Sequence, residues 1–140
     1  MVEEYLDGRE YCVGFLGNGP PQILPTCEVL LGHEDGIPFF SREYKRRDRD
    51  KLEFDITLEC PIHKRMVDSC RFLWDIMGLH DYARFDFRCG PDGVPRFLEV
   101  NALPGLSPVS GIFVRQAAAA GIGFDRLIDT IARRVFATID

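Results

Sequence analysis

Hydrophobic residues in the first 31 positions fall into two short runs with a turn between them. Residues 9–16 are apolar on both alternating faces, which is typical of a central strand covered on each side. The turn-forming segment 17–21 leads to a second apolar run at residues 23–31, and Pro25 makes the first part of that run an edge or a bend. The two runs together predict a hairpin.

Three later segments have the period of amphipathic helices. An apolar stripe lies between Pro61, near the start of a predicted helix, and Gly78, at its end, and it indicates that this helix packs on the sheet. A second helix is expected from about residue 110 to 120, ending at Gly121, and a third follows it. The stripe of the first helix consists of Ile62, Met66, Val67, Cys70, Leu73, Ile76 and Met77, and that of the third of Leu127, Ile128, Ile131, Ala132, Val135 and Phe136.

Two further strands are predicted at residues 82–89 and 94–101, on either side of a glycine-ended turn at 90–93. The order of strands, helix, strands and helices indicates an α+β domain built on an antiparallel sheet. Residues 41–51 have no apolar period and many charges, so we expect an exposed loop there. A solvated surface without a specific function is the alternative for that loop.

Composition narrows the class of protein. The chain has 140 residues, 46% of them hydrophobic, enough for one domain with a modest core. With 17 basic and 22 acidic residues the net charge is −5, which argues against nucleic acid as a main partner. Long apolar runs and an export signal are both missing, so we expect a soluble, cytoplasmic protein without a membrane partner. The five cysteines are far apart and are expected to be reduced and packed.

The chemistry-bearing residues gather on the second pair of strands. Period-two alternation puts Arg84, Asp86 and Arg88 on one face and aromatic residues on the other, and in the partner strand Glu99 and Asn101 share a face. In a simple register Asp86 and Glu99 are cross-strand neighbours, and two carboxylates at about 4 Å repel by roughly 1 kcal/mol in water. A cation is therefore expected between the two acids, and the oxygen donors of Asp86, Glu99 and Asn101 suit a magnesium ion. Alternatively, the two arginines simply neutralise these acids.

The segment after these strands leaves the sheet through a Pro-Gly turn at 104–105, which places backbone N–H groups beside the predicted metal. Arg-Phe-Asp at 84–86, Phe-Leu-Glu-Val-Asn-Ala-Leu-Pro-Gly-Leu at 97–106 and Val-Glu-Glu-Tyr-Leu-Asp-Gly-Arg-Glu at 2–10 together resemble the D-alanine–D-alanine ligase branch of the ATP-grasp superfamily. The resemblance runs from Val2 almost to Asp140. It implies one partial ATP-grasp domain over residues 1–140, the C-terminal half of that fold, an antiparallel sheet with flanking helices that forms one jaw around ATP.

The resemblance also implies roles for individual residues. Asp86, Glu99 and Asn101 match the family's Mg²⁺ ligands, a set that could also take Mn²⁺. The loop at 41–51 would be a lid over the phosphates. Strict alternation would put Leu98 on the other face of the strand from Glu99, so the match of Leu98 to the adenine pocket is less direct than that of the other positions. The positions that match nucleotide contacts are Glu3, Glu4, Tyr5 and Leu6 beside adenine, Glu10 at the ribose hydroxyls, Phe39 and Leu98 at the adenine walls, and Lys45 in the lid.

Three further positions match the catalytic part of the family's site. Arg84 and the Gly105 backbone match donors that stabilise a tetrahedral oxyanion. Ser110 matches a contact to the carboxylate of the second amino acid; its alternative role is a helix N-cap, and both roles could hold together. The implied chemistry is ATP-dependent ligation in peptidoglycan biosynthesis: D-alanine or a similar amino acid becomes an acyl phosphate, and the amine of a second one attacks it.

The family's chains are much longer than this one. The sequence begins inside the segment that matches the adenine-binding strand, so we expect the other ATP-grasp jaw to be absent and the isolated chain to have little ligase activity. Three hypotheses follow: a ligase of this family present as its C-terminal portion, a Mg-ATP-binding module that needs a separate partner half, and a non-catalytic remnant domain. Homodimerisation is open in each of them.

Overall fold

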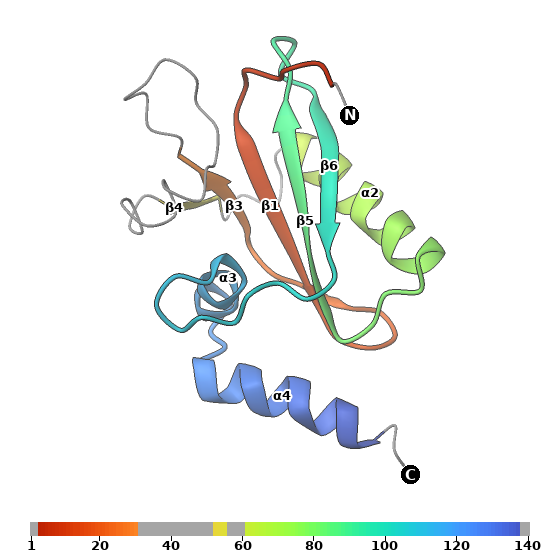
Figure 1. The fold of residues 1–140 in the computed structure, drawn as a ribbon, viewed down its shortest axis with the longest axis vertical. Helices are drawn as coiled ribbons and strands as arrows, with labels where there is room; N and C mark the ends of the chain where they lie inside the picture. Colours follow the sequence, from red (N-terminus) through yellow and green to blue (C-terminus); the bar gives the residue numbers. More distant parts are fainter. Residues whose placement is uncertain (1–2, 31–51, 56–60, 138–140) are drawn as a thin grey trace.

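The computed structural model describes residues 3–30, 52–55 and 61–137, and its centre is one antiparallel sheet (Figure 1). The strand order is β4-β3-β1-β5-β6, with the short β2 also paired to β1. Every pairing is antiparallel, which confirms both the predicted hairpins and the α+β class. The strands are β1 (Glu10–Leu16), β2 (Gln22–Ile23), β3 (Thr26–Val29), β4 (Leu52–Asp55), β5 (Tyr82–Cys89) and β6 (Pro95–Asn101).

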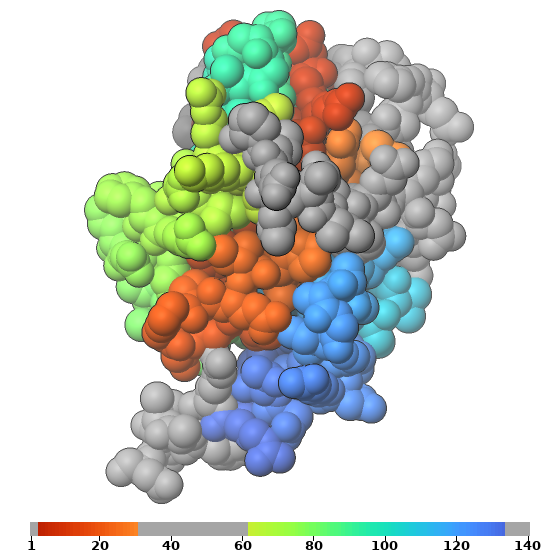
Figure 2. All heavy atoms as spheres, turned by 180° about the vertical axis from the view of Figure 1, so that it is seen from behind, coloured from red at the N-terminus to blue at the C-terminus, as the bar shows by residue number. Residues whose placement is uncertain are grey.

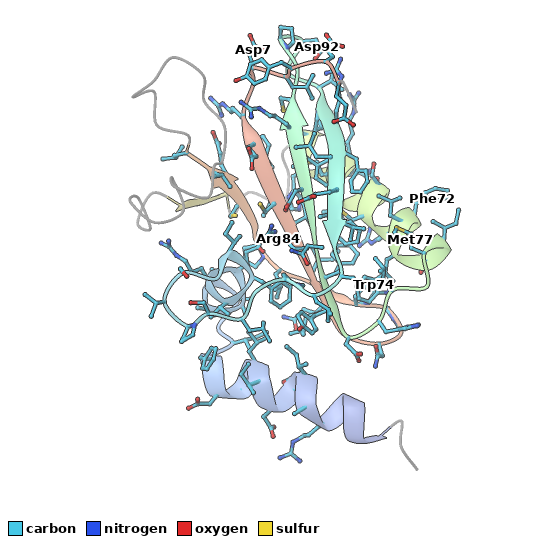
Figure 3. All side chains as sticks on the ribbon, in the orientation of Figure 1. Asp7, Phe72, Trp74, Met77, Arg84 and Asp92 are labelled. Carbon is cyan, nitrogen blue, oxygen red and sulfur yellow. The ribbon has the colours of Figure 1, made fainter. Side chains whose placement is uncertain are left out.

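One face of the sheet packs against helix α2 (Pro61–Ile76) around a core of aromatic and aliphatic side chains. Most of the predicted stripe faces this core, but its end does not, since Ile76 and Met77 are 66% and 51% exposed. Trp74 closes this end of the core instead, with its ring 5.7 Å from that of Phe15. Figure 3 shows Met77 at the outer end of α2, where the chain turns at Gly78 with a φ of +60°. The last turn of α2 therefore contacts the core through Trp74, while Ile76 stays exposed.

Helices α3 (Ile112–Ala119) and α4 (Phe124–Ala137) cover part of the other face. Gln116 of α3 is fully buried, and its Nε2 donates to the carbonyl oxygens of Cys12 and Pro25, at 2.9 Å each. Seen from behind in Figure 2, the orange segment after β1 lies between α2 and the two blue helices. In the described part of the chain three helices thus flank the sheet, α2 on one face and α3 and α4 on part of the other.

The cysteines that the structure describes are buried free thiols, as expected from the sequence. Cys12 and Cys27 are directly opposite each other on β1 and β3. A hydrogen bond with Cys27, together with burial, raises the pKa of the Cys12 thiol well above its ordinary value. These thiols are therefore packing groups.

Two sequence predictions lie outside the described residues: the lid at 41–51, with Lys45, and the adenine wall at Phe39. In the part of the chain that is described, no helix has the length and apolar character needed to cross a bilayer.

Candidate functional site

The β5–β6 hairpin brings four of the predicted site residues together. Asp86 is opposite Glu99 and Arg84 is opposite Asn101, as the simple register predicts. The alternate residue Phe85 is fully buried in the core on the α2 side. Because side chains alternate along a strand, these four polar groups share the opposite face.

Asp86 is already engaged by a cation of its own strand. The Arg84 Nε and Nη2 donate to the two carboxylate oxygens at 2.8 and 2.7 Å, and the two side chains are only 12% and 10% exposed. Burial by itself would lower the pKa of Arg84, but the hydrogen bonds and charge of Asp86 raise it above its ordinary value. Among the described residues no cation pairs with Glu99, so the neutralising network considered from the sequence exists for Asp86 alone.

A bulge in β6 changes the geometry next to Glu99. Asp86 pairs with Glu99 but the next residue, Phe87, pairs with Phe97, so Leu98 is an extra residue in β6. Strict alternation, which would put the Leu98 side chain on the other face of the sheet from Glu99, therefore does not apply at this point of β6. Leu98 is 47% exposed and belongs to none of the buried core clusters of the described residues. It is available to line a site beside Glu99.

The loop that follows β6 carries the other two catalytic candidates. Leu103 N donates to Asn101 Oδ1 at 3.2 Å, which fixes the Asn101 amide as the chain leaves the sheet. The Ser110 hydroxyl donates to Ser107 Oγ at 3.0 Å, and both serines are exposed. The N-cap of α3 is Gly111 and it has no side-chain cap, so the alternative role of Ser110 as an N-cap is wrong.

Gly105 lies in the same loop and is exposed. Within the described residues its N–H donates no hydrogen bond, and a Cβ at this position would meet nothing within 4 Å. The open space around this backbone fits a donor that contacts a ligand.

Glu10 and the N-terminal residues of the predicted nucleotide set lie at the other end of the same face. Glu10 is opposite Arg88, two positions from the Cys12–Asp86 pair, so Glu10 and Asp86 point to the same side. Gly8 N donates to Cys89 O at 3.0 Å, which extends the pairing beyond β1. Before it, Glu3, Glu4 and Tyr5 are exposed and Leu6 is half-buried. This N-terminal segment passes over the end of the β5–β6 hairpin in Figure 1.

Asp86, Glu99 and Asn101 fit a hard divalent cation by the chemistry of their donors, which are two carboxylates and an amide oxygen. The oxygens of Asp86 and Asn101 that accept hydrogen bonds each have a second lone pair. The described residues contain no cluster of three His, Cys, Asp or Glu side chains that could hold a metal ion. The predicted set has two such side chains, and its third member is an asparagine. Such a site would leave several coordination positions to phosphate oxygens and water.

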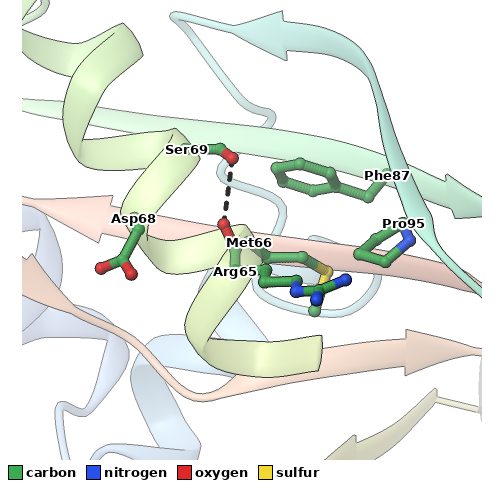
Figure 4. Close-up of a pocket in the computed structure, with 6 residues that line it drawn as sticks. All are labelled: Arg65, Met66, Asp68, Ser69, Phe87 and Pro95. Atoms are coloured by element: carbon green, nitrogen blue, oxygen red, sulfur yellow. Dashed lines mark hydrogen bonds between the residues drawn. The ribbon is translucent and has the colours of Figure 1, made fainter. Parts of the chain in front are cut away.

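A surface pocket of about 340 Å³ between α2 and β6 lies apart from this face (Figure 4). Phe87, whose side chain belongs to the α2-side core, lines it together with Met66. The Ser69 hydroxyl at its rim donates to the Arg65 carbonyl at 3.0 Å. The pocket is therefore on the opposite side of the sheet from Asp86 and is not part of the site.

Comparisons with known proteins identify the family of this chain. The family model described as the D-ala D-ala ligase C-terminus matches residues 1–133. The D-alanine–D-alanine ligase of Desulfotalea psychrophila is 34% identical over 137 residues, which cover 94% of this chain and 40% of the relative. An uncharacterised protein of Sinorhizobium fredii is also 34% identical, over 94% of this chain and 39% of its own length. The chain thus spans about two fifths of the length of these relatives.

Solved structures show the same relation. A D-alanine–D-alanine ligase from Bacillus anthracis, complexed with ATP, has a TM-score of 0.68 at 25% identity and covers 94% of this chain and 38% of its own. The D-Ala:D-Ser ligase from Enterococcus faecalis has a TM-score of 0.66 at 20% identity, over 92% of this chain and 36% of its own, a likeness of fold alone.

Proposed function

The chain belongs to the D-alanine–D-alanine ligase family of ATP-grasp proteins, of which it spans the C-terminal part, and on this premise we propose that it provides the metal, phosphate and oxyanion contacts of an ATP-dependent carboxylate–amine ligase. The observation that carries the proposal is the register of β5 and β6. It sets Asp86 opposite Glu99 and Arg84 opposite Asn101 on one face of the sheet.

Asp86, Glu99 and Asn101 are the proposed ligands of Mg²⁺, or of Mn²⁺. A metal ion held by these residues would offset the negative charge of the ATP phosphates. Asp86 has a second task, because its carboxylate also holds the guanidinium of Arg84 through two hydrogen bonds. Arg84 is thereby fixed as a cation beside the reacting groups before any substrate arrives.

Arg84 and the Gly105 N–H are the proposed donors to the oxyanion of the acyl-transfer step. Preorganised donors of this kind contribute most when they need not reorient during the reaction, and Arg84 meets this condition because its Nε and Nη2 are held by Asp86. Ser110, exposed at the start of α3, is the proposed contact for the carboxylate of the second substrate, D-alanine or a similar amino acid.

The nucleotide contacts are proposed at the opposite end of the face. Glu10 would accept from the ribose hydroxyls, and the segment Glu3–Leu6, with Glu4 and Tyr5, would contact adenine together with Leu98. Phe39 and Lys45 complete the proposed set. The remaining contacts of a ligase would come from the part of the fold that the relatives have in addition, in the same chain or in a separate one.

The proposal is tested by calorimetric titration of Mg-ATP into the wild-type chain and into Glu99→Gln. We chose this variant because Glu99 is exposed and pairs with no cation among the described residues, so its loss should not disturb the fold. We expect magnesium-dependent binding to the wild type and its loss in the variant. Asp129→Asn, on the exposed face of α4, is the matched control and should bind normally. An absence of binding by the wild type would contradict the proposal.

One observation favours a non-catalytic remnant as a second candidate. The Arg84–Asp86 pair already satisfies the buried carboxylate without a metal. In a remnant, Glu99→Gln would leave both the thermal stability and its response to Mg²⁺ unchanged, whereas a metal site would lose its magnesium-dependent stabilisation.

A further inference from the structure

We propose that Arg88 is a positioning residue that fastens the N-terminal segment 3–8 to the sheet and orients Glu10 within the nucleotide site. The inference rests on the proposed function for the role of Glu10. Arg88 matches none of the positions that the family resemblance singles out, and the structure gives it contacts to two of them.

Arg88 contacts both Tyr5, in the N-terminal segment, and Glu10, in β1. It lies in β5, is 7% exposed, and its Nη1 is 3.8 Å from Glu10 Oε2. Its Nη2 donates to the Tyr5 hydroxyl at 3.2 Å, and its Cζ lies 5.1 Å from the centre of the Tyr5 ring. One guanidinium thus binds Tyr5 through both a hydrogen bond and a cation–π contact.

The contact with Glu10 is an ion pair rather than a hydrogen bond. At 3.8 Å it compensates the charge of a carboxylate that is almost fully buried, without itself using an acceptor position of that carboxylate. A carboxylate that receives ribose hydroxyls inside the protein needs its charge compensated, and Arg88 supplies a cation for this.

The charges across the sheet direct Arg88 toward Glu10. Arg88 is directly opposite Arg96 of β6, and like charges in this position repel. Arg96 is held by Asp92, whose two carboxylate oxygens accept from it at 2.9 and 3.0 Å. Each arginine therefore contacts an acidic side chain, Asp92 in the case of Arg96 and Glu10 in the case of Arg88.

Two properties should consequently change together when Arg88 is replaced: the order of the segment 3–8 and the recognition of ribose hydroxyls. The first is measured by amide hydrogen exchange of residues 3–8 without nucleotide. The second is measured by the ratio of the affinities for Mg-ATP and for Mg-2′,3′-dideoxy-ATP, which lacks both hydroxyls. A residue that only stabilises the fold would change both affinities equally and leave this ratio alone.

We expect Arg88→Met to raise the exchange rate of residues 3–8 by about tenfold, the effect of losing one charge-assisted hydrogen bond. Tyr5→Phe should raise it less, because it keeps the ring contact. The affinity ratio should fall toward that of Glu10→Gln in Arg88→Met and should be largely retained in Arg88→Lys, which keeps the charge. Arg133→Met, on exposed α4, is the matched control and should change neither property.

Unchanged exchange in Arg88→Met would overturn the fastening role, and Tyr5→Phe decides the same point if that variant does not fold. Faster exchange with an unchanged affinity ratio would overturn the positioning role. If the wild type binds neither nucleotide, the proposed function fails together with the role of Glu10. The exchange data still decide whether Arg88 fastens the segment.

Discussion

The Asp86 carboxylate serves two partners in the proposed site, a metal ion and the Arg84 guanidinium. Arg84 occupies both of its oxygens at 2.7–2.8 Å, whereas Glu99 across the strand pair is exposed. Replacing Asp86 therefore removes an ion pair in addition to a metal ligand, and the two acids must be tested separately.

We expect Asp86→Asn to lower the free energy of unfolding by about 3 kcal/mol, because it leaves Arg84 with an uncompensated charge in a nearly buried position. Urea-induced unfolding without metal measures this change. Glu99→Gln should stay within about 0.5 kcal/mol of the wild type, as surface substitutions usually do. Equal effects of the two substitutions would show that the Arg84–Asp86 pair contributes no stability.

Thr26 and His63 form a second buried polar contact. The Thr26 hydroxyl and His63 Nδ1 are 2.7 Å apart and join β3 to α2. Thr26→Val should cost about 1–3 kcal/mol because the His63 nitrogen loses this partner inside the protein. Thermal unfolding measures the cost, with Thr130→Val on α4 as the control of equal chemistry, since the hydroxyl of Thr130 is bonded only to its own helix. A cost no larger than that of the control would contradict the prediction.

At the scale of elements, the loop between β6 and α3 depends on a close backbone approach at Gly111. A Cβ there would lie 2.7 Å from Ser107 O and 2.8 Å from Gly105 O, and backbone atoms cannot yield without moving the loop. The loop that holds Gly105 and Ser110 is thus kept in place by a glycine outside the set of proposed contacts.

Gly111→Ala should destabilise the chain by about 1–3 kcal/mol, the usual cost of overpacking, and should shift the amide resonances of residues 105–110. Gly123→Ala is the control, because a Cβ at position 123 meets nothing within 4 Å. Resonances at 105–110 that match the wild type in Gly111→Ala would show that the loop tolerates the methyl group.

The turn between β5 and β6 depends on pH through Asp92. Hydrogen bonds from Arg96 and from the Val94 N–H lower the pKa of Asp92 to about 2. Because the folded pKa is below the ordinary value of 3.8, the stabilisation is complete above pH 4 and is lost as the pH falls toward 2. NMR titration of the Asp92 carboxyl measures this midpoint, which should rise toward the ordinary value in Arg96→Met. A midpoint near 4 in the wild type would contradict the prediction.

At the scale of the whole molecule, the chain covers about two fifths of its ligase relatives, and the face that bears Asp86, Glu99 and Glu10 is the proposed side of a nucleotide site. The fold supports this face by a core on its reverse side, between the sheet and α2. The proposed contacts therefore have a rigid backing that does not depend on the remainder of a ligase.

We expect these 140 residues, tested alone with ATP, Mg²⁺ and D-alanine, to form no dipeptide above background. In the proposed site this chain forms one side, so the other side of a bound nucleotide would be open to water, and an acyl phosphate exposed to water is hydrolysed. Coupled measurement of phosphate release and of the D-alanyl product tests this. Dipeptide formation by the chain alone would show that the other side of the site is unnecessary.

Periodicity and a four-residue turn are local properties, so strands close to β1, β3, β5 and β6, the helix at 61–76 and the pairing of Asp86 with Glu99 could be predicted from the sequence. The strand β4 was not predicted. The roles of the site residues came from the family resemblance and not from periodicity. Phe39 and Lys45 were available from the resemblance alone, since the structure does not describe them.

Which groups meet across the molecule follows from the folded structure. The folded structure has a bulge at Leu98 and pairs Arg84 with Asp86. It also pairs Arg88 with Glu10, and its α3 N-cap is Gly111. These outcomes depend on how charges and volumes from distant segments are shared once the sheet is assembled, and no period along the chain encodes that choice. Arg88 could not be recognised beforehand because Tyr5 reaches it only after the N-terminal segment passes over the hairpin.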